Sequence, residues 1–232
     1  MFSAVVTGAG LSSRMRDDLK KSNLPIRNKL TLPLIESKDN SKTILEFTLD
    51  NVLNSGIDEC FLVLGHYKDE IMDSLDEYYL NKIKIVENNP PDVGLSTSLH
   101  NGLKNLNNKF VLCVSADQPT ISSTTYKNMI IAFFNCNNPD KTISFLRRRK
   151  IGHLTSPLGL GMPFVTSKNL IIPYLKDRNS NLNPILRKIF EDKVKFYAVK
   201  EQFELELVNI NHYTDLQFVI KNIDLNNYFF NL

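Results

Sequence analysis

The sequence lacks any long hydrophobic run. No stretch of about 18 consecutive apolar residues occurs in its 232 residues, so neither a transmembrane segment nor a membrane partner is expected. The first residues, Phe2 to Val6, form a strand candidate without the charged flank and cleavage site of a targeting signal. These features favour a cytoplasmic protein.

The sequence also lacks a strong excess of one charge. Lys and Arg number 28, Asp and Glu number 25, and the formal net charge is only +3. A protein that binds along the phosphates of DNA or RNA normally carries a marked basic bias. We therefore expect no nucleic-acid partner.

Metal-binding and redox residues are few and widely spaced. The three cysteines are Cys60, Cys113 and Cys136, and the first two lie in apolar runs that favour burial as free thiols. The four histidines show no zinc-ligand spacing. A zinc site and a disulfide framework are therefore not expected.

What the sequence does contain is an alternation of short β-branched runs with helical patterns. Strands are predicted at residues 2–6, 60–64, 84–86, 110–114, 142–145, 163–166 and 195–199. Helices are predicted at residues 43–54, 68–75, 95–106, 122–134, 168–175, 183–191 and 214–222. This order predicts one α/β domain over residues 1–232, with a mostly parallel mixed sheet, helices on both faces and ligands at the carboxyl ends of the strands.

The most informative stretch is Ser3 to Met15, an apolar run that ends in a loop rich in glycine and hydroxyl groups. A strand that stops at glycine before a helix start directs backbone N–H groups at one point, where the helix dipole also favours an anion. Arg14 would add a planar guanidinium that matches phosphate oxygens. The stretch therefore predicts a phosphate site.

Two common phosphate loops are excluded by their patterns. Ser13 stands where the dinucleotide fingerprint requires its third glycine, and the Gly-Lys-Ser or Gly-Lys-Thr of a Walker A loop is missing. The stretch resembles instead the signature of MobA-like nucleotidyltransferases, with Lys29 to Leu34 as the lysine segment of that signature. The matching positions are Thr7, Gly8, Ala9, Gly10, Ser12, Arg14 and Met15.

The segment from Arg16 to Asn28 departs from that family pattern, which has only a few residues between Arg-Met and the lysine. It is polar and interrupted by Pro25, and is predicted to be a mobile loop that closes as a lid over the triphosphate. Lys20 and Lys21 compete with Lys29 for the role of the phosphate-facing lysine. The apolar residues after Lys29 favour Lys29.

The second informative stretch is Glu87 to Leu103, a proline-rich loop followed by a helix start rich in hydroxyl groups. Serines at such a position are often helix caps, and a ligand could use the same groups. A hydrolase nucleophile elbow is disfavoured because Ser98 replaces its closing glycine. The stretch is similar to the family segment that contacts the base and ribose of the nucleotide, which implies binding roles for Gly94, Ser96 and Ser98.

The third stretch is Val111 to Pro119, an apolar strand that ends at Asp117. A carboxylate at the end of a central strand suits Mg²⁺ shared with nucleotide phosphates, although an aspartate that only caps a turn would look the same. The stretch resembles the family's Gly-Asp-Gln-Pro, whose aspartate holds the metal. The resemblance therefore implies Mg²⁺ at Asp117.

The C-terminal half matches the family more loosely. Met162 stands where the family usually has histidine, and His153 is too distant in sequence to replace it. The segment Asn209-Ile210-Asn211 resembles the family's Asp-Ile-Asp, so Asn209 is a candidate second metal ligand. The basic run Arg147 to Lys150 is interpreted as a solvated turn, or alternatively as an anchor for a phosphorylated acceptor.

Together the motifs resemble the GT-A-like, Rossmann-like MobA family, closest to its cytidylyltransferases. The resemblance implies transfer of CMP from CTP to the phosphate of molybdopterin, release of pyrophosphate, and handover of the product to a molybdoenzyme or chaperone. Ala9 and the run Ser96 to Ser98 resemble the cytidylyl branch of the family rather than the guanylyl branch, and this resemblance implies CTP rather than GTP. Arg14, Lys29 and Asp117 are the predicted catalytic residues. The alternatives are another phosphorylated acceptor, such as a sugar phosphate, or a nucleotide-binding protein without catalysis.

Overall fold

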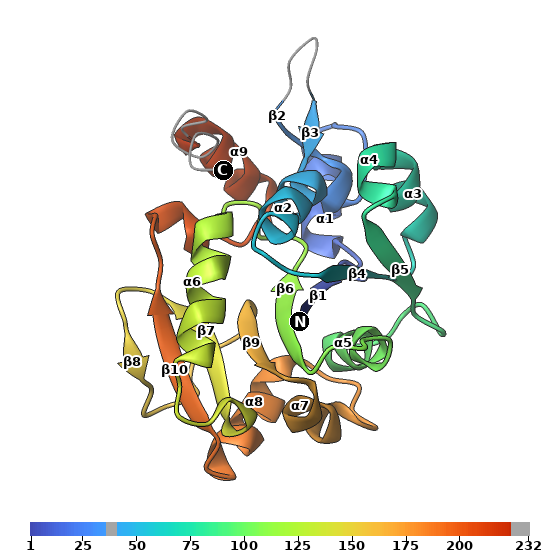
Figure 1. Cartoon of the computed structure of the whole chain (residues 1–232). Helices are drawn as coiled ribbons and strands as arrows, with labels where there is room; N and C mark the ends of the chain where they lie inside the picture. Colours follow the sequence, from blue (N-terminus) through green and yellow to red (C-terminus); the bar gives the residue numbers. More distant parts are fainter. Residues whose placement is uncertain (36–40, 224–232) are drawn as a thin grey trace.

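The computed structural model describes residues 1–35 and 41–223. Its main sheet has eight strands in the order β5-β4-β1-β6-β9-β7-β10-β8 (Figure 1). The strands are β1 (Phe2–Thr7), β4 (Glu59–Leu64), β5 (Ile83–Glu87), β6 (Phe110–Ser115), β7 (Thr142–Arg147), β8 (Gly152–His153), β9 (Phe164–Ser167) and β10 (Lys195–Lys200). A separate antiparallel pair is formed by β2 (Pro33–Ile35) and β3 (Lys42–Thr43).

The sheet is mostly parallel. Strand β1 pairs in parallel with both β4 and β6, whereas β9 is antiparallel to its neighbours β6 and β7. The chain fills one half of the sheet through β4 and β5 and then crosses back to β6 on the other side of β1. The order of the strands therefore reverses between β1 and β6, which is where open α/β sheets bind their ligands.

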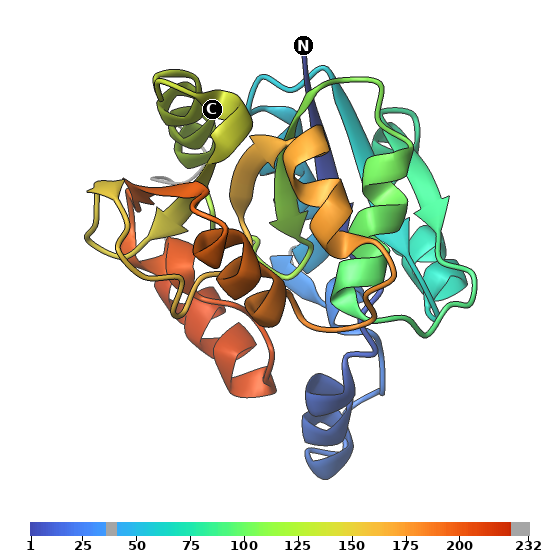
Figure 2. The same ribbon diagram turned by 90° about the horizontal axis from the view of Figure 1, so that it is seen from below.

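Helices cover both faces of the sheet. The α-helices of the described residues are α1 (Ser13–Lys21), α2 (Ile44–Leu53), α3 (Lys68–Ser74), α4 (Glu77–Leu80), α5 (Leu95–Lys104), α6 (Ser123–Phe134), α7 (Lys168–Leu175), α8 (Leu182–Glu191) and α9 (Tyr213–Asn222). Helices α5, α7 and α8 gather on one side, away from α2 and α9 (Figure 1). Figure 2 shows α5 and α7 side by side, as their mutual contacts require.

Alternation along the strands explains the two layers. Ala4 and Val6 of β1 belong to the apolar core under α2 and α6, whereas Val5 belongs to the core under α5, α7 and α8. Helix α5 lies very close to the sheet at Gly102. A Cβ atom at this position would lie 2.6 Å from Val5 Cγ1 and 2.7 Å from Val63 Cγ2, so only glycine fits there. This close packing fixes α5 against β1 and β4.

The predicted α/β architecture is confirmed, and the predicted strands and helices occur within one or two residues of their observed bounds. The prediction of a mobile loop from Arg16 was wrong for residues 16–21, which continue helix α1. Met15 and Leu19, four residues apart on one face of α1, are buried in the core, and this burial outweighs the polar composition of the segment. A disordered lid is therefore not what these residues form.

The structure also shows to what extent the cysteines and the basic run are buried. Cys60 and Cys113 are buried free thiols, and burial raises the pKa of Cys60 to about 12. Arg148 and Lys150 lie exposed in and just after the turn that follows β7, which fits either interpretation of the basic run. No helix in the described part of the chain has both the length and the apolar character needed to cross a membrane.

Candidate functional site

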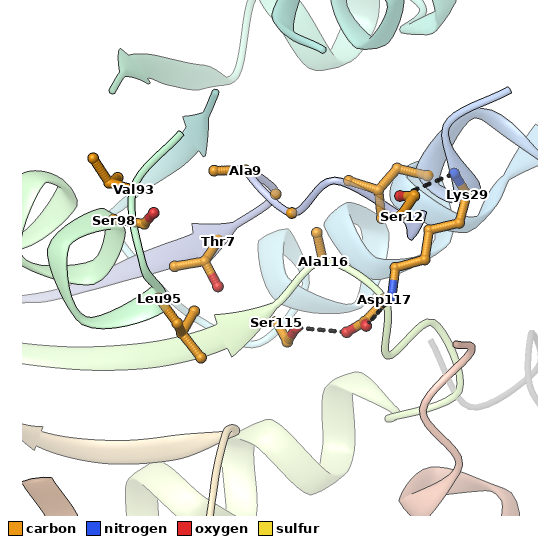
Figure 3. A pocket seen from close by; sticks show the side chains of 13 residues that line it. Thr7, Ala9, Ser12, Lys29, Val93, Leu95, Ser98, Ser115, Ala116 and Asp117 are labelled. Atoms are coloured by element: carbon orange, nitrogen blue, oxygen red, sulfur yellow. Dashed lines mark hydrogen bonds and ion pairs between the residues drawn. The ribbon is translucent and has the colours of Figure 1, made fainter. Parts of the chain in front are cut away.

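A pocket lies where the strand order reverses, at the carboxyl ends of β1 and β6 (Figure 3). Four segments of the chain form its three walls. The glycine loop after β1 contributes Thr7, Gly8, Ala9, Gly10 and Ser12, and the start of α5 contributes Val93, Leu95 and Ser98. The third wall consists of Lys29 and Leu30 together with Ser115, Ala116 and Asp117 at the end of β6.

The glycine loop turns the chain sharply from β1 into α1. Ser12, the residue before α1, has a left-handed backbone with φ 54° and makes no side-chain capping bond. Its hydroxyl instead donates to Asn28 Oδ1 at 3.2 Å and accepts from the backbone N–H of Lys29 at 3.3 Å. Ser12 therefore ties the glycine loop to the lysine segment and leaves the first amides of α1 available to an anion.

Lys29 and Asp117 meet at one end of the pocket. The Lys29 ammonium donates to Asp117 Oδ2, and Figure 3 shows the two side chains pointing toward each other. Ser115 Oγ donates to the other carboxylate oxygen of Asp117 at 2.5 Å. The two sides of the pocket thus bring one cation and one oriented carboxylate to the same place.

The segment after η3 (Glu204–Leu207) completes this cluster. The backbone N–H of Ile210 donates to Asp117 O at 3.2 Å, and Lys29 Nζ donates to Ile210 O at 3.0 Å and to Asn211 Oδ1 at 3.3 Å. Arg14 Nη2 also donates to Asn211 Oδ1, at 3.2 Å. Three oxygens from two distant segments therefore surround the Lys29 ammonium.

This donor set fits a hard divalent cation. A carboxylate, an amide oxygen and a backbone carbonyl are ligand types that Mg²⁺ and Mn²⁺ accept. Within residues 1–35 and 41–223 there is no cluster of three or more His, Cys, Asp or Glu side chains that could hold a metal. A metal at Asp117 would therefore need additional ligands, such as phosphate oxygens and water.

The start of α5 forms the opposite wall. Ser98 is buried, accepts from Asn88 Nδ2 at 2.9 Å and donates to Gly94 O at 3.3 Å. Val93 and Leu95 present apolar surface beside it. This wall is suited to the flat face and edge of a small ring, whereas the opposite end of the pocket is suited to charge.

The structure brings together eight of the predicted site residues as pocket lining: Thr7, Gly8, Ala9, Gly10, Ser12, Lys29, Ser98 and Asp117. Four others lie outside the lining. Arg14 is exposed and reaches the cluster only through Asn211, and Gly94 and Ser96 face the loop after α7. Asn209 is exposed and accepts from Gln118 Nε2 at 2.7 Å, so Asn211 is the asparagine beside Lys29.

Several pocket residues were not predicted from the sequence. Ser115, which orients Asp117, is the last residue of β6 and lies two residues before it, so continuing the period-2 pattern of the strand could have identified it. Asn211 had the same signal as Asn209, because both occupy the Asn-Ile-Asn segment. Leu30, Val93, Leu95 and Ala116 are apolar wall residues that lie within the motif segments but were not singled out in them.

The Gly-Met-Pro segment borders the pocket. Met162 O accepts from Gln118 Nε2 at 3.1 Å, and Thr7 Oγ1 lies 3.8 Å from Met162 Sδ. His153 instead lies in β8 opposite Tyr197, at the far edge of the sheet. Met162 therefore lies beside the pocket, whereas His153 lies far from it.

Comparisons with known proteins agree with this geometry. A family model described as MobA-like NTP transferase domain matches residues 4–176. A nucleotidyl transferase from Methanothermobacter thermautotrophicus is 36% identical, with 95% of this chain and 96% of that chain covered and a TM-score of 0.85. These two matches show the family as well as the fold.

Two more distant structures show the fold alone. A 4-diphosphocytidyl-2C-methyl-D-erythritol synthase from Anaerococcus prevotii is 21% identical, covers 95% of both chains and has a TM-score of 0.67. A protein of Mycobacterium tuberculosis, solved in complex with manganese, is 18% identical over 96% of this chain and 99% of that chain, with a TM-score of 0.66.

Proposed function

Because the chain belongs to the family of MobA-like NTP transferase domains, we propose that it transfers a nucleoside monophosphate from a nucleoside triphosphate to a phosphorylated acceptor. The observation that carries this proposal is the convergence of the glycine loop, Lys29 and Asp117 on one pocket. A triphosphate is bound by hydrogen-bond donors, and its reaction needs positive charge to neutralise the charge that develops on the phosphate oxygens. The pocket offers both.

The glycine loop and the start of α1 would bind the triphosphate. Gly8 and Gly10 let backbone amides approach the phosphate oxygens, and the α1 dipole adds a favourable field. Lys29 would contribute a point charge, and Arg14 would reach the same phosphates once they replace Asn211 as its partner.

Asp117 and Asn211 would hold Mg²⁺, or Mn²⁺, between the protein and the triphosphate. When bound, such an ion neutralises charge that develops on the phosphate oxygens. Ser115 would keep the Asp117 carboxylate turned toward the pocket through its 2.5 Å hydrogen bond. Lys29, which contacts the same oxygens here, would then be free to bind phosphate.

The reaction is a displacement at the α-phosphorus. An oxygen of the acceptor phosphate forms the new bond to that phosphorus, the bond to the bridging oxygen of the β-phosphate breaks, and pyrophosphate leaves with the electron pair. An acceptor phosphate is already an anionic nucleophile, so the protein needs to align it and neutralise charge rather than remove a proton. The pocket residues are of the kind that this requires.

CTP is the favoured nucleotide, and a molybdopterin-type phosphate is the favoured acceptor. Ala9 and Ser98 support CTP as pocket residues, whereas the hydroxyls of Ser96 and Thr97 bond to the loop after α7 and do not contribute to that choice. The alternatives are GTP, a sugar phosphate or another phosphorylated acceptor, and nucleotide binding without catalysis. A cytoplasmic location and a handover to a molybdoenzyme or chaperone stay predictions.

A panel of reactions tests the proposal. Pyrophosphate release is measured for CTP, GTP, ATP and UTP with Mg²⁺, each with molybdopterin, a sugar phosphate and a polyol phosphate. We expect release with CTP and one acceptor and little without an acceptor. If several nucleotides bind but none releases pyrophosphate with any acceptor, the non-catalytic alternative takes the place of this proposal.

A further inference from the structure

Most of the hydroxyl groups at the start of α5 form hydrogen bonds with the loop between α7 and α8. This loop passes against the start of α5, and the contact joins residues that are more than 80 positions apart in the sequence, since Gly94 and Asn179 are separated by 85. Figure 2 shows α7 beside α5, so that the loop leaving α7 runs past the start of α5. We call residues 178–180 the clamp loop.

Backbone and hydroxyl groups form the first part of the contact. The backbone N–H of Ser96 donates to Ser180 O at 3.0 Å, and the N–H of Ser180 donates to Ser96 Oγ at 2.9 Å. The carbonyl of Arg178 accepts from Ser96 Oγ at 3.0 Å and from Thr97 Oγ1 at 2.6 Å. The clamp loop is thereby bonded to two successive residues of the first turn of α5.

Asn179 provides the second part. Its side-chain oxygen accepts from the backbone N–H of Gly94 and, at 3.3 Å, from Thr97 Oγ1. A Cβ atom at Gly94 would lie 2.8 Å from Ser180 N and 2.9 Å from Asn179 C, which are backbone atoms that cannot turn aside. Gly94 is therefore a glycine because the clamp loop approaches its backbone.

The contact has a consequence for the pocket. The first amides of a helix have no partner within the helix, and here Asn179 and Ser180 accept from two of them. The same turn of α5 carries Leu95 and Ser98, which line the pocket opposite Lys29 and Asp117. A displacement of this turn would move that wall relative to the phosphate-binding end.

We propose that Asn179 is a positioning residue, which holds the start of α5 in place and so sets the shape of the nucleotide-facing wall and the choice of base. The proposal rests on the function proposed above, because it takes the wall to contact the nucleotide. Asn179 itself lies outside the pocket lining and is exposed. It acts through α5 alone.

Three variants test the proposal. Asn179→Ala removes the acceptor oxygen, Asn179→Asp keeps it and adds a charge that the α5 N-terminus favours, and Asn181→Ala is the matched control, because its side chain makes no capping bond. Asn179→Ala loses one or two neutral hydrogen bonds, so we expect its KM for the preferred triphosphate to rise about 3- to 10-fold. Its kcat should be almost unchanged. Asn179→Asp and Asn181→Ala should keep the KM of the parent.

A second measurement does not depend on nucleotide. Amide hydrogen exchange at Gly94 and Ser96 should accelerate in Asn179→Ala but not in Asn179→Asp or Asn181→Ala. In the kinetic assays, the ratio of kcat/KM for the preferred nucleotide to kcat/KM for the next best should also fall in Asn179→Ala. Gly94→Ala should reproduce these effects, because its methyl group would displace the clamp loop.

The outcomes separate this inference from the proposed function. A parent protein that binds no triphosphate would overturn both. A parent that binds and turns over nucleotide while Asn179→Ala keeps its KM, its nucleotide preference and its Gly94 exchange rate would overturn only the role of Asn179. A lower melting temperature in Asn179→Ala with unchanged KM and preference would likewise reduce the clamp loop to a structural contact.

Discussion

Lys29 and Asp117 form an ion pair inside the pocket although they are 88 positions apart in the sequence. Their side chains are only 13% and 15% exposed, so the pair is largely withdrawn from water. The ammonium neutralises the carboxylate that the proposed metal would use. If a metal binds Asp117 as proposed, we expect the Lys29 ammonium to leave the carboxylate and bind phosphate instead.

Replacement of Asp117 should remove catalysis while the fold remains. Asp117→Asn keeps an oxygen that can accept from Ser115 but loses the charge that would hold the metal, so we expect turnover to fall at least about 100-fold. Asp140→Asn is a matched control, because Asp140 pairs with Lys109 at an exposed position outside the pocket. Steady-state kinetics and thermal melts measure both effects. Equal activity in Asp117→Asn and the parent would remove Asp117 from the site.

Replacement of Lys29 should improve metal binding in the absence of nucleotide. In Lys29→Met no ammonium competes for the oxygens of Asp117, Ile210 and Asn211, so Mn²⁺ without nucleotide should bind to this variant with a lower Kd than to the parent. Electron paramagnetic resonance or calorimetry measures this Kd. Turnover should nevertheless fall, because the phosphates lose a cation. Lys20→Met, at an exposed position in α1, is the control for charge. Identical Mn²⁺ affinity in Lys29→Met and the parent would show that the ammonium does not compete with the metal.

The choice of nucleotide should appear as a thermal shift. Ligand at 100 times its Kd adds about 2.7 kcal/mol to the free energy of unfolding, which for a chain of this size corresponds to a rise in Tm of about 5–10 °C. With Mg²⁺, CTP should give a larger rise than GTP at the same concentration. A larger rise with GTP would transfer the assignment to guanylyl transfer. No rise with any nucleotide would argue against nucleotide binding.

The stability of the protein should depend on the ionisation of Asp18 in helix α1. The backbone N–H of Tyr213 and the ring of His212 donate to Asp18 at 3.1 and 2.9 Å, and these hydrogen bonds lower the pKa of Asp18 below its ordinary value of 3.8. A lowered pKa in the folded state means that the contribution of Asp18 to stability is complete above about pH 4 and is lost as the pH falls further.

Two variants isolate this contribution. Asp18→Asn should melt at a lower temperature than the parent near neutral pH, and the difference should shrink below about pH 4. Asp17→Asn, at the exposed neighbouring position, should melt like the parent throughout. A difference between Asp18→Asn and the parent that is independent of pH would show that ionisation of Asp18 does not stabilise the contact between α1 and α9.

The sequence predicts most of the fold because its periodic segments are long enough to be decisive. Helix α1 is an exception, since only Met15 and Leu19 carry its apolar face and the remaining residues are polar. The local motifs also predict much of the pocket, because the glycine loop and Asp117 each follow a strand that ends at the same edge of the sheet.

Contacts between distant segments are what the sequence does not reveal. The run Ser96 to Ser98 contains three hydroxyls, and only Ser98 lines the pocket, because the clamp loop bonds the other two. The choice between Asn209 and Asn211 is likewise made by their neighbours, Gln118 for one and Lys29 for the other. The spacing of residues along the chain does not reveal which serine or which asparagine faces the pocket.

The transfer of label from a nucleotide is the most direct test of nucleotidyl transfer at this pocket. The protein is incubated with Mg²⁺, a phosphorylated acceptor and CTP that carries a radioactive α-phosphate, and both products are quantified. We predict equal amounts of labelled acceptor conjugate and pyrophosphate from the parent, and neither from Asp117→Asn. Label that stays in CTP, or is released only as free CMP with every acceptor tried, would contradict the account.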